Sequence, residues 1–264
     1  MEIDVPHHEE GKKGWKQYFF DFLMLFLAVF CGFLAENIRE GRVEDERAVV
    51  LAKNLYKEVL ADSIRVQQMI AVRKIKESEC TYFIAYVKDS SLTKLSNRFY
   101  RSFSWAFIQT GRILFEPDDG ILNQLKNSGE LRYFKSAEFQ SAVGALSVAI
   151  ANIRARNDRE YGMVEMYIRP FTLKYYDFNW LKELTRDGDL EFTAAMLHQV
   201  DVPITGKMPN LETFDRKEAE NIASYYLLML RSTRMAQYIK YTHANAHILK
   251  ILRKEYHAEL NNSH

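Results

Sequence analysis

Hydrophobic residues are unevenly distributed along this chain, and the first feature is an unbroken apolar run near its N-terminus. Residues Phe22 to Ala35 read FLMLFLAVFCGFLA, without one charged side chain. Counted from Trp15, the segment has 21 residues. At a rise of about 1.5 Å per residue, a helix of this length spans roughly 30 Å, the thickness of the hydrocarbon core of a bilayer. We therefore predict a transmembrane helix at residues 15–38.

The residues that flank the run support this prediction. Trp15 and Tyr18 lie where the aromatic belt of a membrane interface is expected. Three nearby basic side chains can reach lipid headgroups: Lys12, Lys13 and Lys16. On the far side the run ends abruptly at polar residues, and Glu36 and Asn37 become candidates for contact with the membrane surface or a partner.

Two other interpretations compete with a retained span. A cleaved signal peptide needs small residues before the cut, but Phe33 occupies a position that should be small, and Phe30 before Cys31 disfavours a lipoprotein. A buried core helix of a soluble protein is the third interpretation. The sequence does not decide which end of the span faces the cytoplasm, because the basic residues on its two sides nearly balance. Three precede the span, and four follow it: Arg39, Arg42, Arg47 and Lys53.

Beyond the run, apolar residues recur at alternating spacings of three and four up to about Val87. This stripe, with charged residues on the opposite face, predicts that the helix continues: Val49, Ala52, Tyr56, Val59, Ser63, Val66 and Ile70. It packs either inside a bundle of its own chain or in an intermolecular coiled coil, and the pattern leaves both open. Ser90, Ser91 and Thr93 then mark a break, followed by an aromatic-rich stretch from Phe99 to Phe107.

A helix-turn pattern follows in FEPDDGILNQLKNSGELRYF. We predict a helix that starts after Pro117, with Asp118 as its N-cap and Asp119 in its first turn. Ser128 and Gly129 should end it, since glycine readily adopts the left-handed conformation of a helix C-terminus.

Ser136 is expected to cap the next helix, with Glu138 in its first turn. An apolar stripe follows with a polar interruption at Asn157 and Pro170 near its end: Phe139, Val143, Leu146, Ile150, Ile153, Val164, Ile168 and Phe171.

Glycine and proline make residues 177–209 the least regular region, with a short helix expected around Leu190–Gln199. A last long helix is predicted from Asp215 to about Glu259, a stretch without either residue. The fold class is thus all-α, one N-terminal transmembrane helix continuing into an antiparallel bundle of long helices. The expected division is a cytoplasmic tail at 1–14, the span at 15–38 and a helical soluble domain at 39–264.

Composition narrows the function classes. The net charge is +1, from 36 basic and 35 acidic residues, so no global field attracts nucleic acid. The two cysteines, Cys31 and Cys80, form no disulfide framework, because Cys31 lies inside the apolar run.

Candidate chemistry is sparse. His243 and His247 share a helix face but have no evident third zinc ligand, so a solvated face is the better interpretation, with metal binding left open. Acidic residues around Gly188 are too few for a calcium loop: Asp187, Asp189 and Glu191. No phosphate loop, nucleophile elbow or Cys-x-x-Cys motif occurs, and we expect no cofactor and no catalytic site.

Two local patterns carry a resemblance. Tyr18-Phe19-Phe20-Asp21 opens the apolar run, which closes as Ala35-Glu36-Asn37-Ile38-Arg39-Glu40, and Phe115-Glu116-Pro117 leads into Leu122-Asn123-Gln124-Leu125-Lys126-Asn127-Ser128-Gly129-Glu130-Leu131. Together they resemble a domain-of-unknown-function family of single-pass membrane proteins common in Bacteroidetes. The chain departs from that family in lacking a tryptophan at the exit of the span, in having Glu130 where a second glycine is common, and in its short basic leader.

The resemblance implies a protein of the bacterial inner membrane, with a cytoplasmic N-terminus and the soluble domain in the periplasm. It implies no activity. The leading hypothesis is a membrane-anchored structural or interaction protein, whose partners are the lipid bilayer and a second copy or another membrane protein. The alternative is an ion-conducting or stator-like subunit that uses Asp21 at the start of the span. An enzyme with a site assembled from distant residues ranks third.

Overall fold

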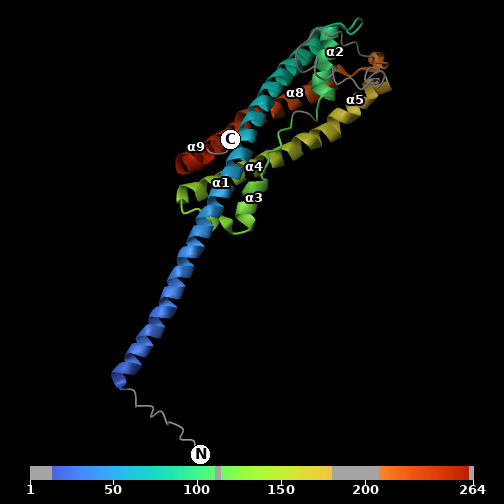
Figure 1. The fold of residues 1–264 in the computed structure, drawn as a ribbon. Coiled ribbons are helices and arrows are strands. Elements are labelled where there is room, and N and C mark those ends of the chain that lie inside the picture. Colours follow the sequence, from blue (N-terminus) through green and yellow to red (C-terminus); the bar gives the residue numbers. More distant parts are fainter. Residues whose placement is uncertain (1–13, 111–113, 180–207, 262–264) are drawn as a thin grey trace, which may run out of the picture. The chain divides into compact units, whose positions relative to one another are not determined.

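The described part of the chain folds into helices (Figure 1). The computed structural model describes residues 14–110, 114–179 and 208–261, and every regular element within these ranges is helical. The prediction of an all-α fold is therefore confirmed. The chain divides into two compact units, Met1–Val50 and Leu51–His264, and the first helix, α1 (Trp15–Asp89), runs through the boundary.

In the first unit, α1 carries the apolar run with its side chains uncovered. An 18-residue window has a mean hydropathy of 2.2, and none of it is buried. Among the exposed side chains are Trp15, Phe22 and Phe33. Length and composition make this helix able to cross a membrane. A core helix of a soluble protein would bury such a surface, so the structure disfavours that interpretation.

In the second unit, the apolar stripe of α1 is covered by the same chain. Ala52, Val59 and Val66 are at most 3% exposed, which supports packing inside the chain's own bundle. Beyond the predicted stripe, the buried face of α1 also carries charged residues. Arg73, which continues the spacing after Ile70, is fully buried, and so is Lys76. These two cations find polar partners across the bundle, described below.

Two short helical elements follow the end of α1. Ser96 caps α2 (Asn97–Phe103), accepting a hydrogen bond from the Phe99 amide at 3.2 Å, and a π-helical turn, η1 (Ser104–Ile108), continues it. The predicted aromatic stretch becomes a cluster around Phe83 of α1, whose ring centroid lies 5.8, 5.9 and 5.1 Å from those of Phe99, Phe103 and Phe107.

The long helix after the turn keeps the predicted stripe inside. Ser136 caps α4 (Ala137–Met163) by accepting from the Phe139 amide at 3.2 Å. The π-helical turn η4 (Val164–Ile168) and α5 (Arg169–Tyr175) continue it. All eight predicted stripe residues are buried. Asn157 is buried too, because its side-chain amide donates to the Phe115 carbonyl at 2.9 Å, so it does not interrupt the packed face.

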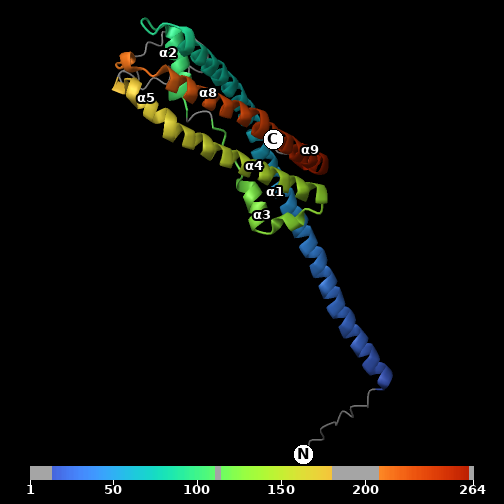
Figure 2. The same cartoon turned by 180° about the vertical axis from the view of Figure 1, so that it is seen from behind.

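The last segment returns along the bundle. A short 3-10 turn, η5 (Leu211–Thr213), precedes α8 (Arg216–Ser232), whose N-cap is Asp215, the residue at which the last long helix was predicted to start. The π-helical turn η6 (Thr233–Tyr238) leads into α9 (Ile239–Asn261). Arg216 donates to the Val87 carbonyl at 3.2 Å and Asn245 to the Val59 carbonyl at 2.9 Å, so this segment runs antiparallel to α1 (Figure 2).

The same segment is also antiparallel to α4. Phe134, just before α4, contacts Tyr256 near the end of α9 at 6.0 Å between ring centroids, whereas Arg156 in α4 donates to Thr233 at 2.7 Å. Helices α4 and α9 pack along each other, and η6 packs on α4. The core therefore lies between α1, α4 and the α8–α9 segment.

The start of the helix after Pro117 differs from the prediction. Helix α3 spans Gly120–Asn127, and its N-cap position is Asp119, not Asp118. The reason is tertiary. The Asp118 amide donates to Asp62 at 2.9 Å, and Arg154 binds the Asp119 carboxylate at 2.6 Å and lowers its pKa.

Glu58 of α1 supplies the cap instead. Its carboxylate accepts hydrogen bonds from the amides of Ile121 at 2.8 Å and Leu122 at 3.3 Å. A residue distant in sequence thus accepts the hydrogen bonds at the N-terminus of α3 that the local pattern predicted for Asp118.

The predicted exit of this helix is confirmed. Ser128 is its C-cap and donates through its backbone amide to the Gln124 carbonyl at 3.0 Å. Gly129 follows with φ of 76°, in the left-handed region, and a 3-10 turn, η3 (Glu130–Tyr133), leads on to α4. The helix expected around Leu190–Gln199 and the acidic cluster of Asp187, Asp189 and Glu191 lie outside the described residues.

Candidate functional site

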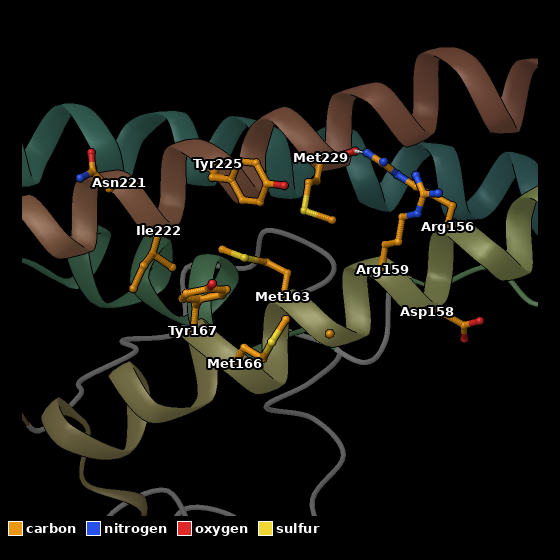
Figure 3. Close-up of a pocket in the computed structure, with 11 residues that line it drawn as sticks. Arg156, Asp158, Arg159, Met163, Met166, Tyr167, Asn221, Ile222, Tyr225 and Met229 are labelled. Carbon is orange, nitrogen blue, oxygen red and sulfur yellow. Dashed lines mark hydrogen bonds between the residues drawn. The ribbon is translucent and has the colours of Figure 1, made fainter.

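A groove lies between α4–η4 and α8 in the described part of the bundle (Figure 3). Its volume is about 830 Å³. Apolar side chains form its centre, Asn221 lies at one end, and two arginines and Asp158 lie at the other. Its lining comprises Arg156, Asp158, Arg159, Gly162, Met163, Met166, Tyr167, Asn221, Ile222, Tyr225 and Met229.

The local backbone explains why apolar side chains reach solvent here. The π-helical turn η4 interrupts the regular spacing right after α4, and Met166 and Tyr167 belong to it. An extra residue in a helical turn rotates the following side chains relative to the buried face, and such turns are frequent at functional sites. Met166, Tyr167 and Tyr225 are 64%, 53% and 56% exposed, so they form an open apolar rim.

Arg156 connects the groove to a polar network inside the bundle. Its guanidinium donates to the Thr233 hydroxyl at 2.7 Å and to the Met229 carbonyl at 3.1 Å. Thr233 in turn donates to the Glu160 carboxylate. Arg156 therefore connects α4 to Met229 of α8 and to Thr233, the first residue of η6. These hydrogen bonds hold the two walls of the groove together at its arginine end.

At the centre of the network is a buried ion pair between α1 and α4. Arg73 donates to both oxygens of Glu160, at 3.1 and 2.7 Å, and both side chains are at most 1% exposed. Arg73 also donates to the Tyr238 hydroxyl at 3.0 Å, and that hydroxyl accepts from the Phe115 amide at 3.1 Å. A bidentate arginine–carboxylate pair with further hydrogen bonds gives geometric specificity, so it fixes the register of the helices.

Lys76 is a second buried cation, one turn further along α1. Its ammonium donates to the Gln109 carbonyl at 2.8 Å and lies 4.8 Å from the centroid of the Tyr226 ring. Burial lowers the pKa of Lys76 to about 8, and burial raises the pKa of the neighbouring Cys80 thiol to about 11. Neither side chain lines the groove, so these groups tie elements together and do not face a substrate-sized space.

A second polar cluster surrounds α3. Asp62 of α1 accepts from the Asp118 amide, from the Tyr241 hydroxyl at 2.7 Å and from Arg65. Asp62 thus joins α1 to the residues just before α3 and to α9, and these hydrogen bonds satisfy its buried carboxylate. Within the described residues, no group of three His, Cys, Asp or Glu side chains is arranged to hold a metal ion. His243 and His247 are both exposed on α9.

The residues predicted from sequence do not meet in one place. Asp21, Glu36 and Asn37 lie on the first unit, where all three are exposed and Glu36 pairs with Arg39 at 2.5 Å. Pro117, Asp118, Ser128 and Gly129 lie in the second unit around α3. None of these seven lines the groove.

Sequence reasoning missed the groove residues. Arg156 and Arg159 lie beside Asn157, where the sequence indicated a polar interruption of the buried stripe. One signal was available, namely the methionines at 163, 166 and 229, which are common at adaptable binding surfaces. The sequence does not show that these methionines line one groove, because that depends on how α4 and α8 align.

Comparisons with protein-family models, with curated proteins and with solved structures found no match to this chain. The family resemblance of its two sequence patterns stays a prediction.

Proposed function

We propose that this protein is a membrane-anchored interaction protein, held in a bilayer by the apolar part of α1, with a bundle that binds a partner protein. The observation that carries the proposal is the apolar window in which no side chain is buried. Exposing so much apolar surface to water is unfavourable, and lipid is the environment that matches it. In the proposal the tail is 1–14, the span 15–38 and the soluble domain 39–264.

The bundle side of the proposal rests on the groove. Its open, methionine-rich centre resembles surfaces that bind other proteins more than it resembles a catalytic pocket, which needs converging polar groups. The proposal assigns the chain no catalytic activity. Following the family resemblance, it places the anchor in a bacterial inner membrane, the N-terminus in the cytoplasm and the bundle in the periplasm.

The second candidate function is an ion-conducting or stator-like subunit that uses Asp21. This residue lies within the apolar part of α1, where a carboxylate is costly and often functional. Under this alternative, Asp21 faces a transmembrane helix of another chain and binds a proton or a cation.

One experiment separates the two candidates. The full chain is purified from native membranes as wild type, Asp21→Asn and Asp21→Leu, and the proteins that co-purify are identified. Glu40→Gln, an exposed acidic residue on the same helix, is the matched control. If the protein is an interaction protein that does not use Asp21, the same partners should co-purify with the wild type and with every variant. Loss of partners in both Asp21 variants, but not in the control, would support the alternative, and a chain that co-purifies with nothing would contradict the proposal.

A further inference from the structure

The arginine end of the groove has more positive charge than its surroundings balance. Arg159 is exposed and forms no ion pair within the part of the chain that the structure describes. Arg156 donates to two neutral oxygens, those of Thr233 and Met229. Glu160 is the buried carboxylate nearby, and Arg73 already binds both of its oxygens. Asp158 points away from the two arginines (Figure 3).

The rest of the groove selects for an apolar, adaptable contact. Methionines reach it from both walls, Met163 and Met166 from one and Met229 from the other, and their unbranched side chains adjust to different shapes. Its volume of about 830 Å³ is close to that of roughly two turns of an α-helix with side chains. An occupant must therefore combine an apolar face with a negative group near one end.

The openness of the rim favours a protein segment over a small amphiphile. Met166, Tyr167 and Tyr225 each leave more than half of their surface exposed. A small ligand normally lies in an enclosed pocket that covers most of it, whereas a helix laid across the groove would cover this rim. A symmetric contact with a second copy would set this face, with its two arginines and one aspartate, against an identical face of the same net positive charge, which is unfavourable.

We propose that the groove binds an amphipathic helix of a different protein, with an aspartate or glutamate of that helix bound by Arg159. The apolar stripe of the partner helix packs on the methionines, and its carboxylate meets the arginine end. This inference rests on the proposed function, which it deepens by naming the surface and the chemistry of the partner.

Residue-resolved photo-crosslinking in native membranes tests it. The full chain carries Met166→benzoylphenylalanine, and the crosslinked peptide is identified by mass spectrometry. Val148→benzoylphenylalanine is the matched control, because Val148 is exposed on α4, which η4 continues, but does not line the groove. The expected product from position 166 is a segment of another protein with apolar residues at spacings of three and four and at least one acidic residue, absent from the control.

A charge exchange then tests the ion pair itself. Arg159→Glu should lower the yield of this product by about tenfold or more, because like charges then face each other. Arg159→Gln should give an intermediate yield, and Lys250→Glu, an exposed change on α9, should leave it unchanged. Replacing the partner's acidic residue by arginine should restore the yield with Arg159→Glu.

Several results would overturn the inference. Crosslinks from position 166 to a second copy of this chain or to lipid would show that the proposed occupant is wrong. An unchanged yield with Arg159→Glu would show that Arg159 does not bind a carboxylate of the partner. If position 166 gives no product while the wild-type chain still co-purifies with partners, the groove assignment fails and the proposed function stands. If nothing co-purifies, the proposed function itself fails.

Discussion

At the scale of single residues, Gly129 is the position where backbone conformation alone decides what is tolerated. Its φ is 76°, and a Cβ added there would meet no atom within 4 Å. We predict that Gly129→Ala lowers the free energy of unfolding by about 1–2 kcal/mol, the cost of a left-handed residue with a side chain. Thermal or urea unfolding measures it.

Gly144 provides the matched control for this change. It lies in the middle of α4, where an added Cβ also meets nothing within 4 Å. Gly144→Ala should stabilise by up to about 1 kcal/mol, because alanine is the better helix former. If both substitutions shift stability in the same direction, the turn after α3 is not as described.

The Arg73–Glu160 pair is the second residue-scale feature with a measurable consequence. Glu160→Leu would leave Arg73 charged and buried without its carboxylate, and breaking such a pair costs about 3–5 kcal/mol. Replacing both residues by leucine should recover much of that loss, since apolar pairs often substitute for buried ion pairs. A single variant as stable as the wild type would show that the pair does not hold α1 to α4.

At the scale of elements, helix ends that depend on neighbouring residues were predictable, and those that depend on distant residues were not. Ser136 and Asp215 cap α4 and α8 through amides three residues later, a pattern visible in the sequence. Asp118 failed as a cap because Asp62 and Glu58, more than fifty residues away, bind the amides there. Local patterns describe local hydrogen bonds, and tertiary ones override them.

Glu58 therefore gives an element-scale prediction. Glu58→Ala removes the acceptor for the first amides of α3 and should lower stability by about 1–2 kcal/mol, as loss of a helix cap does. Lys57→Ala, an exposed change beside it, is the control. Equal melting temperatures for the two variants would show that α3 does not depend on α1 for its cap.

At the scale of the whole molecule, the sequence predicted the bundle but not the groove. Stripes at helical spacing show which face of each helix is buried, as with Val143 and Leu146. They do not show which helices are neighbours. The groove pairs α4 residues such as Met163 with α8 residues such as Met229, and that alignment is fixed by the buried contacts of Glu160 and Thr233.

The bundle should fold without the apolar run. Leu51–His264 forms a compact unit with its own core. We predict that a chain starting at Arg42 shows a helical circular dichroism spectrum and a cooperative thermal transition, because its helices bury one another's apolar faces. A non-cooperative transition would mean that the core needs the N-terminal segment or a partner.

The central claim is that α1 anchors the protein in a membrane, and alkaline extraction of native membranes tests it most directly. Beside the full chain, the chain starting at Arg42 provides the comparison, because it lacks the window in which no residue is buried. The account predicts that the full chain stays with the membrane pellet at its intact mass, whereas the shorter chain is released. Recovery of the protein in the soluble fraction, starting near Glu36, would show that the apolar run is a cleaved signal and would contradict the account.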